Sequence, residues 1–351
     1  MNQKIIDRTL PEICERGFAG KSDLTDLCLL MKEMGIDLFE INFACLDKMV
    51  ELPGNIDFIY RVESERDAEL CRQYGIRECV LSEDVFLNSG LLKGLVRRQI
   101  SITVEAEADT PEEVYALERL GKSKYTGAID CIRIMGLSRC DSASWVMAAH
   151  SIGKALKTAV DICPVNRFYC ATATAVEAFL EGLDSITVTF TGYGGKHGFA
   201  PLEEVLAAIE VFEGAKAGFN LRLLPQLCGL FNKMTGIAVP DNKPVLGKSI
   251  FKYESGIHAD GIQKNPLTYE PFAPEMVGQQ RSLTIGKHSG TGAIAQKLQI
   301  DFDPADLKTI LENVRKKSIG LKRSLTDQEL KEICMQVAGS LKGLQGEGGC
   351  I

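Results

Sequence analysis

Eight short runs rich in β-branched and apolar residues recur at regular spacing, and this repetition constrains the fold more than any other feature of the chain. We expect strands over residues 4–9, 36–43, 56–62, 76–82, 99–107, 128–135, 157–163 and 184–190. The segments between them are long enough for helices, and Thr110 followed by Pro111 is a typical helix start. Eight strands that alternate with helices close into a parallel barrel. The sequence therefore predicts an α/β fold with a (βα)8, or TIM, barrel.

The sequence PDNKP at residues 240–244 marks the end of the predicted barrel, because prolines and an Asp-Asn pair interrupt regular structure. Residues 1–245 are assigned to the barrel. Residues 246–290, which are punctuated by glycine and proline, are assigned to a connector or lid subdomain. Residues 291–351 are expected to form a C-terminal helical segment that ends in a disordered tail over residues 343–351.

Composition excludes several classes of protein. A net charge of -7 on 351 residues argues against a nucleic-acid partner, since phosphate binding needs an excess of basic residues. No apolar run has the length of a membrane span, and the first residues lack the apolar core of a signal peptide. The 12 cysteines include no CxxC pair. We therefore expect a cytoplasmic protein with free thiols and no membrane partner.

Charged residues gather at the carboxyl ends of the predicted strands, where barrel enzymes carry their reacting groups. They include Arg8, Glu12, Glu40, Arg61, Glu105, Glu107 and Arg167. One hypothesis is a barrel with chemistry of its own, which would use Arg61 and one of three glutamates: Glu12, Glu105 or Glu107. The glycine-rich loop over residues 191–198 follows the last strand, where it could contact an anion or acyl-CoA or simply form a turn.

The segment over residues 256–290 contains the second group of candidate functional residues. His258 lies in the sequence GIHADG, Tyr269 follows an Asn-Pro pair, and His288 lies in GKHSG. Histidine transfers protons near neutral pH, and a tyrosine hydroxyl can polarise a carbonyl or position a base. We therefore predict His258 and Tyr269 as catalytic residues, with Asp260 as the acid that orients the histidine. A packing role for Tyr269 and a hydrogen-bonded turn around His288 stay open.

The GIHADG and GKHSG sequences resemble the segment after the barrel in homocitrate and isopropylmalate synthases, above all in the homocitrate synthases of nitrogen fixation. The barrel is similar too, at Glu40, at Glu107, at the sequence APLEE of residues 200–204 and at several glycines after the last strand. The resemblance implies a Claisen condensation of acetyl-CoA, as a substrate, with a 2-oxo acid held on a divalent metal. It also implies substrate contacts by Glu40, Glu107 and Thr191, which stands at the position of the family's strand-8 asparagine.

The barrel departs from the family pattern where the metal would bind. The family begins with a motif like DTTLRDGEQ, whereas this chain reads DRTLPEICE, with Pro11 at the arginine position and Glu12 at the metal-binding acid. At the end of strand 7 the family's HxH pair is replaced within the sequence CPVNR of residues 163–167. Glu12 and Cys163 are the remaining metal candidates. They could join His197 in a zinc site, or Cys163 could simply fill space.

A degenerate metal site beside an intact GIHADG segment suggests half of a heteromer. The hypothesis is an omega-type homocitrate synthase subunit that lends His258 and Tyr269 to a homologous alpha-type barrel subunit, which holds the divalent metal. A homodimer is the other arrangement that the family implies. Alternatives are an enzyme resembling isopropylmalate, citramalate or citrate synthase, with a different 2-oxo acid, and a regulatory partner without catalytic groups.

Overall fold

The computed structural model describes residues 3–17, 21–49, 51–88, 91–97, 99–139, 142–214, 217–299 and 303–338. The chain forms two compact units. Unit 1 comprises Met1–Val239 and Pro244–Leu246, and unit 2 comprises Pro240–Lys243 and Gly247–Ile351. The tail expected over residues 343–351 lies outside the described residues.

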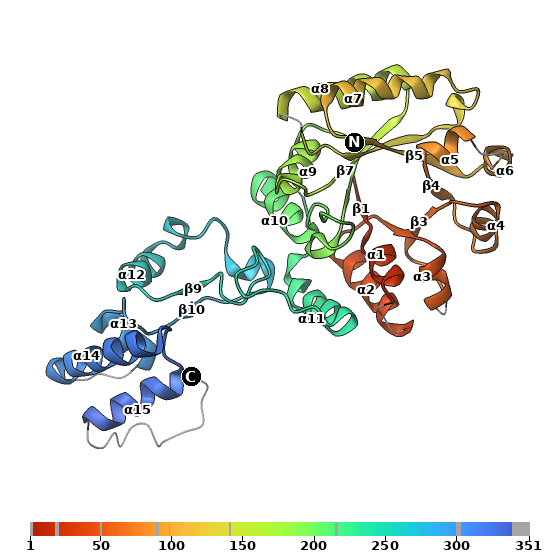
Figure 1. The fold of residues 1–351 in the computed structure, drawn as a ribbon. Helices are drawn as coiled ribbons and strands as arrows, with labels where there is room; N and C mark the ends of the chain where they lie inside the picture. The colour runs from red at the N-terminus through yellow and green to blue at the C-terminus, as the bar shows by residue number, and fades with distance from the viewer. Residues whose placement is uncertain are drawn as a thin grey trace. The chain divides into compact units, whose positions relative to one another are not determined.

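Unit 1 contains a closed barrel of eight parallel strands, which confirms the predicted fold (Figure 1). In chain order the strands are β1 (Lys4–Asp7), β2 (Leu38–Ile41), β3 (Asp57–Arg61), β4 (Glu78–Ser82), β5 (Ser101–Ala108), β6 (Cys131–Gly136), β7 (Ala159–Pro164) and β8 (Ser185–Val188). Strands β1 and β8 pair in parallel and close the barrel, with Lys4 opposite Ser185. All eight strands are shorter than the predicted runs, and in β1, β2 and β8 this is because the last residues of the run belong to the following helix. Asn42, for example, caps a helix by accepting a hydrogen bond from the Cys45 N–H.

Helices cover the outside of the barrel (Figure 1). They are α1 (Thr9–Glu15), α2 (Lys21–Met34), α3 (Phe43–Lys48), α4 (Glu65–Gln73), α5 (Glu83–Asn88), α6 (Leu92–Arg97), α7 (Pro111–Ala116), α8 (Ser142–Leu156), α9 (Ala171–Leu180), α10 (Leu202–Glu213) and α11 (Leu224–Thr235). Thr110 caps α7, as expected, by accepting a hydrogen bond from the Glu113 N–H. Within the described ranges, no helix combines the length and the apolar character that a bilayer span requires.

Side chains inside the barrel change from apolar to charged along the strands. An apolar cluster consists of Ile6, Leu38, Ile59 and Val80. Side chains two residues apart on a strand face the same side. Glu40 therefore follows Leu38 on the inner face, and Arg61 follows Ile59. The same alternation that buries an apolar cluster thus directs charged groups toward the carboxyl end of the barrel.

Unit 2 has its own apolar core. It consists of β9 (Lys252–Tyr253), α12 (Gly256–Lys264), β10 (Ser282–Leu283), α13 (Thr291–Leu298), α14 (Pro304–Leu321) and α15 (Asp327–Ala338), with β9 and β10 paired in parallel. Asp303 caps the start of helix α14, since its carboxylate accepts a hydrogen bond from the Ala305 N–H. One buried cluster joins Ala259 and Ile285 to Ile310 and Cys334. Residues before and after position 290 therefore share a single core.

We predict that the core of unit 2 depends on Ile310. The side chain is completely buried on α14, whereas Ile319 on the same helix is 62% exposed. Replacing Ile310 with Ala should lower the unfolding free energy of unit 2 by about 2–5 kcal/mol, because the change leaves a cavity. Ile319→Ala, the matched control, should change it by less than about 0.5 kcal/mol. Calorimetric unfolding of both variants measures the difference, and equal losses would contradict the assignment of the core.

Candidate functional site

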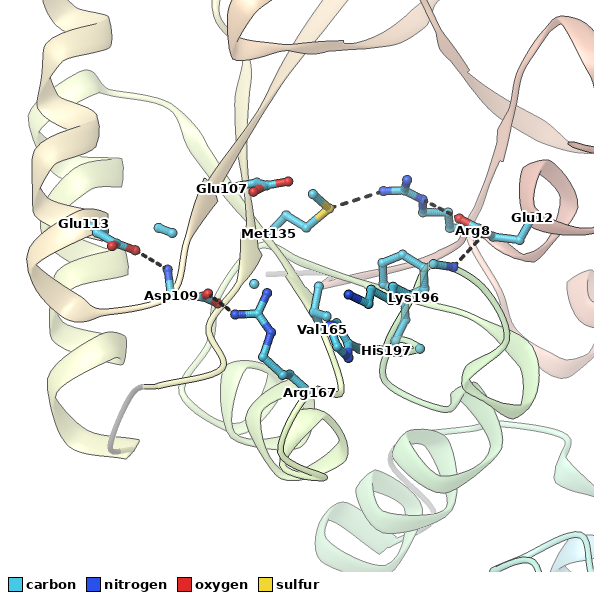
Figure 2. A pocket seen from close by; sticks show the side chains of 15 residues that line it. Arg8, Glu12, Glu107, Asp109, Glu113, Met135, Val165, Arg167, Lys196 and His197 are labelled. Carbon is cyan, nitrogen blue, oxygen red and sulfur yellow. Dashed lines mark hydrogen bonds and ion pairs between the residues drawn. The ribbon is translucent and has the colours of Figure 1, made fainter.

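A cavity of about 600 Å³ opens at the carboxyl end of the barrel (Figure 2). Its charged and histidine lining residues are Arg8, Glu12, Glu107, Asp109, Glu113, Arg167, Lys196 and His197. They come from the segments that follow β1, β7 and β8, and from the end of β5 and the start of α7. The barrel therefore brings together side chains that are far apart in the sequence, at the end where chemistry occurs in this fold.

An ion network lies beside the cavity. Arg61 donates from Nε to Glu40 Oε1 at 2.9 Å, and from Nη1 and Nη2 to the two oxygens of Glu105 at 2.9 and 2.8 Å. Arg8 donates from Nη1 to Glu105 Oε2 at 3.0 Å. Burial opposes ionisation of Glu105, but the Arg8 and Arg61 guanidinium groups outweigh it and hold the pKa of this carboxyl at about 2. The pKa of Glu40 is also lowered, since its arginine neighbours outweigh complete burial.

The network continues to the fully buried Arg133. This guanidinium pairs with Glu40 and with Asp161, which also accepts a hydrogen bond from Thr187 Oγ1 at 2.7 Å. Arg133 on β6 and Asp161 on β7 are direct register partners. Sequence reasoning missed this pair because both residues lie inside apolar strand runs. The sequence did contain a signal for this pair. A single charged residue at an inward-facing position of an apolar strand needs a partner of opposite charge.

Asp7, at the end of β1, is a buried acid with a raised pKa. Its carboxyl is completely buried and accepts hydrogen bonds from the Thr9 N–H at 3.0 Å and the Thr9 hydroxyl at 2.6 Å. Burial raises the pKa of Asp7 to about 7. Thr9 Oγ1 also accepts a hydrogen bond from the Phe190 N–H at 2.7 Å, which links β1 to the segment after β8.

Glu12 lies in the cavity wall, held by the loop that follows β8. Its Oε2 accepts a hydrogen bond from the Gly195 N–H at 3.0 Å, and its Oε1 lies 3.7 Å from Arg8 Nε. Gly194 has a φ of +127°, and a Cβ added there would lie 2.5 Å from the Glu12 side chain. Only glycine allows this close approach. His197 lines the same cavity.

The residues present do not fit a divalent metal. Cys163 is completely buried, does not line the cavity, and has its pKa raised to about 12 by burial. The structure therefore does not bring it to Glu12 and His197 as a zinc site. Over the described ranges, no group of three or more His, Cys, Asp or Glu side chains is arranged to hold a metal ion.

Of the three predicted substrate-binding residues, Glu107 lines the cavity, whereas Glu40 and Thr191 do not. Glu107 lines the cavity and is exposed, and no hydrogen bond or ion pair joins its carboxylate to another described residue. Glu40 is buried in the ion network and does not line the cavity. Thr191 also lies outside the lining; its N–H donates to Glu203 Oε2 at 2.8 Å. The φ of Thr191 is +58°, a conformation that costs a β-branched residue more than an asparagine.

His258 and Tyr269 form a ring pair on unit 2. His258 is exposed on α12, Tyr269 is 45% exposed, and their ring centroids lie 4.6 Å apart with an edge-to-face angle of 64°. Gly261 makes room for this pair, because a Cβ there would lie 2.4 Å from Tyr269 Cε2. The expected orienting role of Asp260 is not seen: its carboxylate accepts a hydrogen bond from Lys264 Nζ at 2.7 Å. Residues two apart on a helix do not face each other.

His288 belongs to a turn built around Glu254. The His288 N–H donates to Glu254 Oε1 at 2.7 Å, and the Ser289 hydroxyl donates to the Glu254 carbonyl oxygen at 3.1 Å. Ser324 donates to the other carboxylate oxygen at 2.7 Å. The GKHSG sequence therefore fixes the backbone of unit 2, and the His288 side chain is exposed.

The barrel, its cavity and the appended unit define a TIM-barrel protein with a separate domain after the barrel. A family model described as "Homocitrate synthase post-HMGL domain-like" matches residues 245–322. The omega subunit of homocitrate synthase from Clostridium pasteurianum is 35% identical over 341 residues, which cover 95% of each chain. The chain belongs to the homocitrate synthase family.

One further comparison agrees with the family, and another with the fold. Homocitrate synthase AksA from Methanocaldococcus jannaschii is 34% identical over 242 residues, which cover 67% of this chain and 59% of that protein. The crystal structure of hydroxymethylglutaryl-CoA lyase from Pseudomonas aeruginosa superposes with a TM-score of 0.54 at 12% identity, and covers 68% of this chain and 94% of the lyase. The second likeness shows the barrel fold alone.

We predict that Arg133 stabilises the barrel strongly. Arg133→Met leaves Asp161 and Glu40 buried with too few cationic partners, so the unfolding free energy should fall by about 3–5 kcal/mol. Arg72→Met is the control, because Arg72 forms an exposed ion pair with Glu69, and should have little effect on stability. Urea unfolding followed by the fluorescence of Trp145, the only tryptophan, measures both. A small effect of Arg133→Met would show that the network is not needed for stability.

We also predict a pH effect from Asp7. The folded protein binds the Asp7 proton more tightly than the unfolded chain, so stability from this group is present below pH 4 and is lost as pH rises toward 7. The loss should reach up to about 4 kcal/mol. Asp7→Asn should remove this decline. Urea unfolding of the wild type and the variant at intervals between pH 5 and pH 8 tests it, and parallel pH profiles would contradict the raised pKa.

Proposed function

We propose that this chain is an omega-type subunit of a homocitrate synthase, which acts together with a homologous alpha-type barrel subunit. The alpha-type subunit would hold the divalent metal, and the pair would condense acetyl-CoA with 2-oxoglutarate. The observation that carries the proposal is the contrast between two parts of one chain. In the barrel, Glu40 and Glu105 are paired with arginines, whereas unit 2 presents an exposed pair of His258 and Tyr269.

In the proposed reaction His258 is the proton-handling group. Its exposed imidazole would accept a proton from the methyl group of acetyl-CoA. The carbon so activated would form a bond with the keto carbon of the 2-oxo acid, whose oxygen would then be protonated. Water would finally cleave the thioester and release CoA. The edge-to-face contact with Tyr269 would fix the orientation of the imidazole and would place a hydroxyl beside it.

The similarity to the Clostridium pasteurianum omega subunit over 95% of both chains supports the choice of an omega-type role. The resemblance to nitrogen-fixation enzymes suggests that the product serves that process. Free thiols at Cys14, Cys28 and Cys163 support a reducing, cytoplasmic location. A sister 2-oxo acid would change the product but not the roles of His258 and Tyr269.

The proposal predicts that His258 is needed for turnover but not for assembly. The chain is mixed with a metal-bearing alpha-type barrel subunit, and CoA release is measured with acetyl-CoA and 2-oxoglutarate. His258→Gln should lower the rate by a factor of about 100 or more, the usual contribution of a general base. Size-exclusion chromatography should show the same complex as for the wild type. His288→Gln is the matched control, since this exposed histidine lies in a structural turn of the same unit, and should keep the rate.

Two outcomes would contradict the proposal. Unchanged turnover of the His258→Gln mixture would favour a regulatory partner that lends no catalytic group. Full turnover by this chain alone would show that no division of labour exists between two subunits.

A further inference from the structure

Glu40 and Glu105, the two glutamates of the ion network, have no carboxylate oxygen free of a guanidinium contact. Glu40 receives Arg61 on Oε1 at 2.9 Å and Arg133 on Oε2. Glu105 receives Arg61 on both oxygens and Arg8 on Oε2 at 3.0 Å. A hard divalent cation needs several oxygens that converge on it with free lone pairs. All four carboxylate oxygens are instead committed to guanidinium groups.

Arg8 has the position in this network that a bridging cation would need. Its guanidinium lies 3.0 Å from Glu105, 3.7 Å from Glu12 and 3.8 Å from Glu40, so one positive group contacts carboxylates from three separate elements. The Phe199 ring packs against it, with the Arg8 Cζ 5.0 Å from the ring centroid. The Arg8 side chain is 13% exposed, and it lines the cavity.

From this arrangement we infer that the Arg8 guanidinium stands in for a divalent cation, so that the barrel of this chain binds no metal. An arginine stays charged at every accessible pH, and its planar fork matches carboxylates geometrically. Entry of a divalent ion would break several charge-assisted hydrogen bonds and would bring two further positive charges beside three arginines. The oxygens that a divalent ion would need are therefore already occupied by guanidinium groups.

The remaining cavity acids do not offer a replacement site. Glu12 Oε2 already accepts the Gly195 N–H, and Glu113 Oε2 accepts the Asp109 N–H at 2.6 Å. The Asp109 carboxylate pairs with Arg167 at 2.7 Å. Glu107 is left with a carboxylate that no other described residue contacts by a hydrogen bond or ion pair, and one carboxylate does not form a divalent-cation site by itself. The inference thus holds for the whole cavity wall. It does not depend on the role proposed for His258, because it concerns the isolated chain.

The test is a titration of the isolated, metal-stripped chain with Mn²⁺ and with Zn²⁺. Equilibrium dialysis and the Mn²⁺ electron paramagnetic resonance signal should show less than about 0.1 ion bound per chain at the barrel, and melting temperature should not rise with metal. One equivalent of bound metal that is lost in Glu12→Gln would overturn the inference. Metal that binds equally to the wild type and to Glu12→Gln, without raising the barrel's melting temperature, lies outside the mouth and agrees with it.

Removing the guanidinium gives the complementary test. Arg8→Met should lower the melting temperature without metal, because three carboxylates lose a cation, and Mn²⁺ should restore part of that loss by binding in the vacated position. Arg16→Met is the control; Arg16 is exposed and stacks over Tyr193 outside the network, so neither change should occur. If Arg8→Met folds and gains no Mn²⁺ response, Arg8 is not a substitute for the ion. The wild-type titration decides the question even if this variant does not fold.

Discussion

Three arginines and three acids at the carboxyl end of the barrel neutralise one another, and the geometry of the mouth depends on this balance. Charges buried in a protein interior are tolerated only when each has partners of opposite sign. Arg133 is completely buried, so its contacts with Glu40 and Asp161 fix the inner end of the network. Arg8 and Arg61 continue it to the cavity wall.

Because of this ion network, the barrel and unit 2 differ in the chemistry that their side chains can support. A barrel in which guanidinium groups occupy every oxygen of Glu40 and Glu105 has little capacity for a divalent cation. The exposed ring pair of His258 and Tyr269, by contrast, has no such internal commitment and lies on a unit with its own core. Under the proposed function, a barrel without metal ligands is compatible with a proton-transfer role for His258, because the other subunit would supply the ion.

Much of the fold followed from local patterns. The eight strands were predictable because β-branched runs at regular spacing are a property of short segments, and the helix starts at Thr110 and Asp303 follow from capping side chains. The candidate site was less predictable. Glu12 and Glu107 were correctly expected at the mouth, because strand ends converge there in any such barrel, but the burial of Glu40 and Cys163 depends on inner neighbours that spacing does not reveal.

The sequence by itself determined the barrel, the strand ends that face its mouth and the segment that carries His258, since each is encoded by residues close together in the chain. Only the tertiary structure decided which charges meet. Arg133 and Asp161 are opposite each other because β6 and β7 pair in one register, and Tyr269 rather than Asp260 contacts His258 because Gly261 leaves room for the ring. Closure of the barrel and packing of side chains determine these contacts, because both bring together residues that are distant along the chain.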